Sequence, residues 1–207
     1  MNYLVSFKNK NKGFTLVELV VVIAIAMVIT TAVVIQQGSM NDQLALKTQA
    51  YELAMMIRQA QIYSLGVRED VNGSGDKFNV GYGMHIDTNG PVADRTIFFA
   101  DRNGTLQYNS SPDEAIETKI FTRGIKVNKV CAPNPSAPPP LLCNGSSAPK
   151  QIDIIFLRPD PKVKEFRFMD NSGAKLLLSP PAIIRLISPN DKTIDITVEA
   201  NGQISIE

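Results

Sequence analysis

The chain has 207 residues, enough for one domain of ordinary size with an additional segment but few for two full domains. Hydrophobic residues make up 44% of it and charged residues 20%, which excludes the disordered, collagen-like and multi-spanning classes. The formal charge of +1 becomes −2 once the first 13 residues, with three lysines and no acid, are set aside. This slightly acidic remainder lacks the basic footprint of sequence-independent nucleic-acid binding, so we expect no nucleic-acid partner.

The chain begins with a short basic leader, residues 1–13, followed by an apolar run over 14–37. A secretory signal has a shorter apolar region, roughly 7 to 15 residues, and a small-residue cleavage site after it. Here 22 residues from Phe14 to Ile35 carry one charge, and as a helix they span roughly 33 Å, enough to cross a hydrocarbon core of about 30 Å. The lysines should stay in the cytoplasm. We therefore expect a single pass through the lipid of the cytoplasmic membrane, with the rest of the chain outside the cytoplasm.

Glu18 is the only charged residue in the apolar run. A carboxylate within a spanning helix costs roughly 2.5 to 3.5 kcal/mol near the bilayer centre and less toward an end. Such an acid requires a partner, and we expect the run itself to supply none.

The sequence KGFTLVEL at residues 12–19 resembles the prepilin processing motif of type IV pilins and type II secretion pseudopilins. In that family, prepilin peptidase cuts after the glycine, the new terminal phenylalanine is N-methylated and the glutamate is retained. The resemblance places these roles on Gly13, Phe14 and Glu18. It also implies three kinds of partner: other pilin or pseudopilin subunits, prepilin peptidase, and an inner-membrane assembly platform.

Cleavage between Gly13 and Phe14 would create an α-amine whose pKa is near 8. This amine lies four residues from Glu18, or about 6 Å along a helix. In an array of staggered identical helices, Glu18 of one subunit meets the Phe14 amine of another. Because an ion pair in low dielectric is costly to leave half-made, we expect the pair to set the axial register of assembly.

Residues 38–66 are expected to continue the helix as an amphipathic segment. An apolar stripe recurs there at spacings of four and three, and its simplest interpretation is core packing; it comprises Leu46, Ala50, Leu53, Ile57 and Ala60. Gly38 predicts a kink or local melt. The helix should end near Leu65, with Gly66 in the left-handed conformation common after a helix terminus.

Residues 67–207 predict a β-rich head. Runs of β-branched and aromatic residues indicate strands over 78–86, 95–100, 119–130, 151–157, 163–169, 182–187, 193–198 and 203–206. Turn sequences at 101–104 and 170–173 separate candidate strand pairs, and Asn201-Gly202 predicts a two-residue hairpin. The fold class expected is α+β, with an antiparallel sheet packed on the inner stripe of the long helix. This order of elements is similar to that of minor pseudopilins at the tip of type II secretion systems, and of related minor pilins.

Cys131 and Cys143 are the only cysteines, and the segment 131–149 that contains them has six prolines. We interpret it as a surface loop without regular structure, which the two cysteines close as a disulfide if the head is exported to an oxidising compartment.

No catalytic constellation emerges from the remaining residues, so we expect no enzyme activity, no cofactor and no metal. His85 is the only histidine, and its strand pattern favours a packed or surface role. The fragments 87–90 and 101–104 share residues with calcium loops but lack the later glutamate, which favours turns. Some pseudopilins bind calcium near the carboxyl end; Asn190, Asp191 and Asp195 are too few here to carry that role over.

The function expected is a structural subunit of a type IV pilus-like filament or a type II secretion pseudopilus. Two alternatives remain: a DNA-binding minor pilin for uptake, which would need clustered Arg and Lys on the head, and a membrane-anchored surface domain that never polymerises. Pilus, secretion and competence systems share the amino-terminal signal, and so do major and minor subunits.

Overall fold

The computed structural model describes residues 13–66, 78, 80–110, 114–134, 141–143, 148–170, 172, 174–176 and 178–207, with only the main chain at 35–39. Internal contacts divide the chain into two compact units, Met1–Asn41 and Asp42–Glu207, which are described separately.

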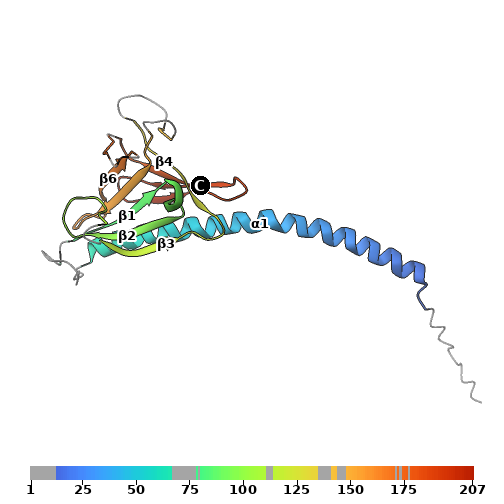
Figure 1. Ribbon diagram of the computed structural model, residues 1–207. Coiled ribbons are helices and arrows are strands. Elements are labelled where there is room, and N and C mark those ends of the chain that lie inside the picture. Colours follow the sequence, from blue (N-terminus) through green and yellow to red (C-terminus); the bar gives the residue numbers. More distant parts are fainter. Residues whose placement is uncertain are drawn as a thin grey trace, which may run out of the picture. The chain divides into compact units, whose positions relative to one another are not determined.

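One α-helix, α1, runs from Leu16 to Leu65 (Figure 1). The main chain is helical through Gly38, so the local melt expected there is absent; a glycine inside a helix costs only about 1 kcal/mol relative to alanine. The helix ends where predicted, but Gly66 is not left-handed. Its N–H still donates to the carbonyl of Ile62, at 3.0 Å, as an ordinary helical bond, which explains why no reversal of φ is needed at this residue.

The predicted inner stripe of α1 is confirmed as the helix face that packs on the head. Its five side chains are 3% exposed or less: Leu46, Ala50, Leu53, Ile57 and Ala60. They join one hydrophobic core with side chains from the strands. Burial of this stripe therefore makes residues 42–65 an integral part of the second unit.

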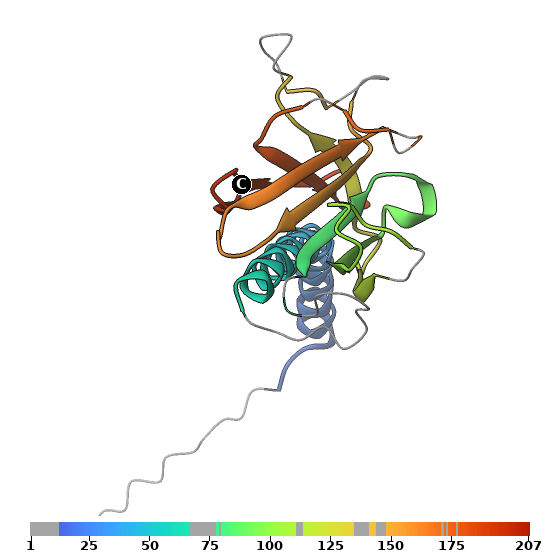
Figure 2. The same ribbon diagram turned by 90° about the vertical axis from the view of Figure 1, so that its left-hand side faces the viewer.

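Nine strands and a short 3₁₀ helix follow α1 in the described part of the chain (Figures 1 and 2). Their bounds are β1 Gly81–Asp87, η1 Gly90–Val92, β2 Arg95–Asp101, β3 Ala115–Ile120, β4 Lys126–Cys131, β5 Gln151–Phe156, β6 Val163–Met169, β7 Ala182–Ile187, β8 Thr193–Val198 and β9 Ile204–Ile206. All pair antiparallel, in a five-stranded sheet of order β3-β2-β1-β5-β6 and a four-stranded sheet of order β4-β7-β8-β9. The fold class is therefore α+β and pilin-like, as predicted.

The head contains two sheets where the sequence predicted one. The run 119–130, expected to be one strand, is divided between β3 of the first sheet and β4 of the second. Arg123 and Gly124 both have positive φ, 58° and 68°, and the Ile125 N–H closes the turn on the Thr122 carbonyl at 3.2 Å. Two consecutive residues of positive φ reverse the chain, so an apolar run that looks continuous cannot remain one strand.

Two of the three predicted turns do not form simple hairpins. Residues 101–104 open a longer connection between β2 and β3, and the turn after Asp170 leads only to an isolated bridge between Met169 and Lys175. The third connection is a hairpin, since β8 and β9 pair around Asn201-Gly202, but it is not the two-residue turn predicted. Glu199 and Gln203 pair across a three-residue loop, in which the Gly202 N–H donates to the Glu199 carbonyl at 2.9 Å and Gly202 has φ 83°.

Alternating side chains of both sheets meet over α1. In β1, Tyr82, Met84 and Ile86 point into the core; in β7, Ala182, Ile184 and Leu186 do the same. Figure 2 shows the strands of both sheets on one side of this part of α1. The opposite side of the helix is left outside the core.

Candidate processing and assembly site

The amino-terminal end of α1 is closed by a reciprocal pair of side-chain contacts between Thr15 and Glu18. The Thr15 hydroxyl accepts the Glu18 backbone N–H at 3.2 Å, while Glu18 Oε2 accepts the Thr15 backbone N–H at 2.9 Å and its hydroxyl at 2.8 Å. This is a capping box, which satisfies backbone donors that the first turn of a helix leaves without partners.

The capping box corrects the expectation that the apolar run offers Glu18 no partner. Thr15 supplies two hydrogen bonds from inside the run. The carboxylate also lies in the first turn of α1, where the helix dipole favours negative charge. Glu18 is therefore hydrogen-bonded within its own chain, although no opposite charge contacts it in the described residues.

The two carboxylate oxygens of Glu18 differ in their contacts. Both bonds from Thr15 end on Oε2. No hydrogen bond to Oε1 is found among the described residues. One oxygen thus holds the cap while the other can accept a donor from another molecule.

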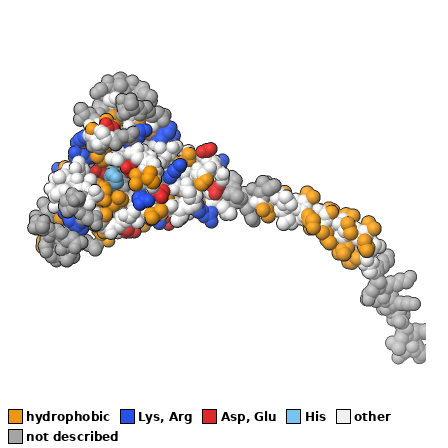
Figure 3. Space-filling model, in the orientation of Figure 1, with side chains coloured by type: hydrophobic (Ala, Val, Ile, Leu, Met, Phe, Trp, Pro, Cys, Tyr) orange, Lys and Arg blue, Asp and Glu red, His pale blue; other side chains and the backbone are white. Residues whose placement is uncertain are grey.

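The segment after the cap has an apolar, exposed surface. Leu16–Val34 is long and apolar enough to cross a membrane, with a mean hydropathy of 2.7, and none of it is buried within the chain. Hydrophobic side chains cover the visible face of this segment in Figure 3. Its hydroxyls are satisfied internally, since Thr30 and Thr31 donate to the carbonyls of Ala26 and Met27 at 2.6 and 2.8 Å. This matches the requirement that polar groups in lipid find partners within the helix.

Comparison with known protein families matches residues 8–34 to the prokaryotic N-terminal methylation motif. The match covers the basic end of the leader, the Gly13-Phe14 junction, the capping box and the apolar segment. No curated protein and no solved structure matches the chain. The motif and the apolar helix together support a type IV pilin-like prepilin, a substrate of prepilin peptidase that is anchored in a membrane and assembles with other pilins.

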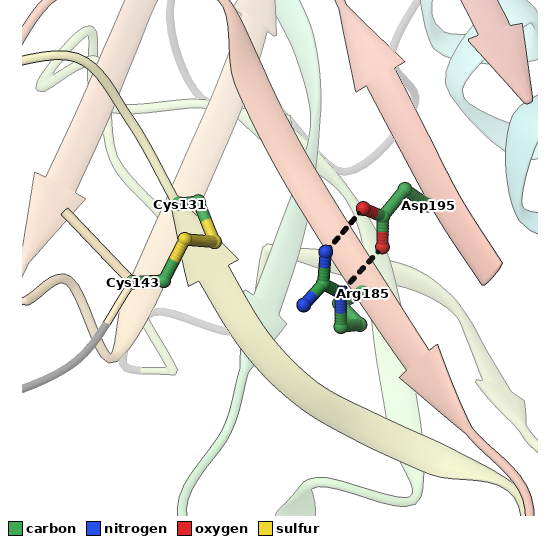
Figure 4. The surroundings of a disulfide bond; sticks show 4 residues. All are labelled: Cys131, Cys143, Arg185 and Asp195. Carbon is green, nitrogen blue, oxygen red and sulfur yellow. Dashed lines mark hydrogen bonds and ion pairs between the residues drawn. A yellow bond between two sulfur atoms is a disulfide. The ribbon is translucent and has the colours of Figure 1, made fainter. Parts of the chain in front are cut away.

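Cys131, at the end of β4, is joined to Cys143 by a disulfide (Figure 4). The described ends of the segment are held to the head: Ala132 and Leu142 form an antiparallel bridge, and Ala148 is fully buried. Most of the Pro-rich part of 131–149 lies outside the described residues.

Arg185 on β7 and Asp195 on β8 form a bidentate ion pair on the second sheet (Figure 4). Arg185 Nε and Nη2 donate to the two Asp195 oxygens at 2.7 and 2.6 Å. The hydrogen bond to Asp195 raises the pKa of Arg185 above its ordinary value. Asp195 is therefore engaged within the sheet, and Asn190 contacts Asp42 of α1.

His85 lies on β1 of the first sheet, and its side chain is packed against its neighbours. Its Nδ1 lies 2.6 Å from Oδ1 of the buried Asp153, and its ring lies against that of Tyr108, with centroids 4.9 Å apart. Asp153 Oδ2 accepts the Tyr108 backbone N–H at 2.9 Å. These contacts give His85 the packed role that the sequence predicted.

Two further buried carboxylates hold the connection between β2 and β3. Asp101 accepts the backbone N–H groups of Thr105 and Leu106, each at 3.0 Å. Glu114 accepts those of Arg102 and Asn109, at 3.1 and 2.8 Å. Burial raises the pKa of both Asp101 and Glu114, although the bonds from backbone N–H groups oppose the shift.

The fragments that share residues with calcium loops are turns. In 101–104 the Asp101 carboxylate binds backbone N–H groups, and in 87–90 Asp87 accepts the Asn89 N–H at 2.7 Å. The described residues contain no group of three or more His, Cys, Asp or Glu side chains placed to hold a metal ion.

Three features of these sites were not predicted from the sequence. Thr15 and Glu18 show the Thr-x-x-Glu spacing of a capping box, so a local signal was present. The buried role of Asp153 depends on contacts with His85 and Tyr108, which are distant in the sequence. Glu114 binds backbone N–H groups within the connection between β2 and β3, a role that no motif in that segment indicates.

Proposed function

We propose that the protein is a filament subunit of a type IV pilus-like or type II secretion-like system, with a structural and not a catalytic role. The capping box carries the proposal, because it holds Glu18 in place with one oxygen and leaves Oε1 for a neighbouring subunit. After cleavage between Gly13 and Phe14, the natural donor is the methylated Phe14 amine of that neighbour.

Processing and assembly are coupled in this proposal. Before cleavage, Phe14 carries no charge, so Glu18 has its cap but no counter-ion. Cleavage removes the three lysines of the leader and creates one positive charge at the amino-terminal end of an apolar helix. In the low dielectric of the membrane, this charge attracts Glu18 of a neighbouring subunit. The ion pair therefore stabilises only the axial position of the two subunits at which the amine and the carboxylate meet.

Glu18→Gln separates the ion pair from the cap. Glutamine keeps the capping-box hydrogen bonds but carries no charge. Leaving the Phe14 amine of the neighbour without its acid should cost about 3–5 kcal/mol per subunit contact, the range measured for a broken buried pair. We expect normal membrane insertion and strongly reduced incorporation into filaments, measured by shearing and immunoblotting.

Thr15→Ala is the matched control, since it removes the cap and keeps the charge. Losing a cap costs about 0.5–2 kcal/mol, confined here to the first turn of a long helix. Incorporation should stay near that of the wild type. Equal assembly defects in the two variants would show that Glu18 acts only by capping the helix. Normal assembly of Glu18→Gln would refute the ion pair.

Mass spectrometry of the protein from its native membrane tests the processing step. The expected amino terminus is N-methylated Phe14 in the wild type and an uncut leader when Gly13 is replaced by a bulky residue. An intact leader on the wild-type protein would favour a membrane-anchored domain that never polymerises. Electron microscopy with a labelled head would then assign a processed protein to the tip or the length of a filament.

A further inference from the structure

The connection between β2 and β3 begins with residues 102–110, which lie against the outer face of the first sheet and are called the strap below. The Tyr108 ring packs on His85 of β1 and on Phe99 of β2, with centroids 4.9 and 5.5 Å apart. Phe99 is fully buried but is not part of the core that α1 shares with the sheets. The strap therefore helps to cover this face of the sheet.

Three carboxylates attach the strap to the sheet. Asp101 and Glu114 each accept two of its backbone N–H groups, and Asp153 accepts one; the donors are Arg102, Thr105, Leu106, Tyr108 and Asn109. Among the described residues, no hydrogen bond between main-chain groups joins the strap to a strand. The position of the strap thus depends on side-chain acceptors that can change their charge.

The three carboxylates are buried and close enough to repel one another. Asp101 is 5% exposed, and Glu114 and Asp153 are fully buried. Burial raises the pKa of both Asp101 and Glu114, and a neighbouring carboxylate raises it further: Asp153 acts on Asp101, and Asp101 acts on Glu114. The hydrogen bonds from the strap lower both pKa values but do not reverse the shift. Ionising these groups is therefore unfavourable while the strap covers them.

Basic side chains face this cluster from neighbouring strands and from the strap itself. His85 Nδ1 lies 2.6 Å from Asp153 Oδ1. Arg167 on β6 is opposite Asp153 in the sheet, and its Nη1 donates to the Thr105 carbonyl at 3.3 Å. Arg102 is the charged residue within the strap. Loss of a proton from His85 at higher pH would leave the cluster with a larger excess of negative charge.

We propose that the strap is a pH-sensitive device, closed over the first sheet at acid pH and released as its carboxylates become charged at higher pH. Because the pKa values of Asp101 and Glu114 are raised when the strap is closed, closure is favoured at low pH and weakens as pH rises through the raised values. Release returns the charged groups to water and uncovers His85 and Phe99. The inference does not rest on the proposed function, since none of these residues takes part in processing.

Hydrogen–deuterium exchange of the full-length protein in detergent, followed by mass spectrometry, tests the strap. Protection of peptides that cover 102–110 is measured from about pH 4.5 to about pH 8 and corrected for the intrinsic pH dependence of amide exchange. Peptides from β7 and β8 of the second sheet serve as the internal reference. We expect protection of the strap to fall several-fold toward the upper end of the range, while β7 and β8 stay protected.

Asp101→Asn and Glu114→Gln separate the charge of the acceptors from their shape. Each variant keeps a side chain of the same size with one accepting oxygen, so the strap can still close. We expect a smaller fall in strap protection across the pH range in each variant, and the smallest fall in the double variant. Glu165→Gln on β6 is the matched control, because Glu165 binds Lys175 outside the strap, and it should leave the fall unchanged.

Several results would overturn the inference. Strap protection that is constant or rises with pH would exclude release, and so would a strap that exchanges freely over the whole range. A parallel loss of protection in β7 and β8 would show that the whole head loses stability. If the double variant lost strap protection as steeply as the wild type, the carboxylates would not be the cause. Near-ultraviolet circular dichroism checks the folding of each variant, and the wild-type series tests release without any substitution.

Discussion

Gly83 in the middle of β1 is a position where a single methyl group should destabilise the head. It lies on the outer face of the first sheet, paired with Phe99 on one side and Ile155 on the other. A Cβ at this position would lie 2.7 Å from the Ile154 carbonyl oxygen and 2.8 Å from Cζ of Phe99. Ordinary van der Waals contacts begin at about 3.4 Å, so both neighbours would have to move.

Neither neighbour can move easily. The Ile154 carbonyl belongs to the main chain of β5, which is hydrogen-bonded in the sheet between β1 and β6. The Phe99 ring is fully buried and packs against Tyr108, with centroids 5.5 Å apart. Overpacking of this kind costs about 1–3 kcal/mol. For a unit of this size, that lowers the melting temperature of Gly83→Ala by roughly 2–12 °C.

Gly81→Ala on the same strand and the same face is the control. The nearest heavy atoms to its added Cβ would be 3.5 Å away, an ordinary contact, and its φ is not positive. Replacing glycine where the backbone allows it stabilises by about 0.4–1 kcal/mol, because the unfolded chain loses freedom. We expect an unchanged or slightly raised melting temperature.

The assay is thermal unfolding of the full-length protein in detergent, followed by near-ultraviolet circular dichroism of its tyrosines. Tyr82, next to Gly83, is buried in the core and reports on this region. A Gly83→Ala protein that melts at or above the wild-type temperature would refute the steric reasoning. Equal losses in both variants would show that strand glycines matter here for another reason.

Three further substitutions in the second unit have expected outcomes by the same assay. Leu53→Ala removes a fully buried side chain between α1 and the sheets and should cost about 2–5 kcal/mol; a loss below 1 kcal/mol would mean that the helix is not packed as described. Arg123→Asn places Asn-Gly in a turn whose two central residues have positive φ, and should raise the melting temperature, while a decrease would contradict the turn geometry. Burial raises the pKa of Glu114, so its contribution to stability is present below the pKa of the unfolded chain and is lost as pH rises through the folded value. Glu114→Gln should therefore flatten the fall of stability as pH rises above about 4, and an unchanged pH profile would refute this assignment.

Hydrophobic periodicity predicted the parts of the fold that depend on local sequence. The stripe from Leu46 to Ala60 packs inward because its spacing places five apolar side chains on one helix face. Most strand ranges are also recovered, since alternating side chains must be buried on one side. The division into two sheets is not local: it depends on the chain reversal at Arg123-Gly124, where an arginine adopts a positive φ that its residue type does not predict.

The candidate site also combines local features, which the sequence predicts, with contacts between distant residues, which it does not. The processing motif is contiguous, so residue types and spacing are sufficient to recognise it at Gly13, Phe14 and Glu18. The contact between His85 and Asp153 joins residues 68 positions apart and depends on the register of β1 against β5. No pattern around either residue carries that information.

The capping box explains how an acid can be kept in the apolar helix before it has a counter-ion. An isolated carboxylate costs roughly 2.5 to 3.5 kcal/mol at the bilayer centre, but Glu18 lies in the first turn, with two hydrogen bonds from Thr15 and the favourable end of the helix dipole. These contacts offset part of the cost without using Oε1. Glu18 therefore has hydrogen bonds but no positive charge beside it in the described residues. In the proposed function a processed neighbour supplies that charge, so proteolysis would control assembly through electrostatics.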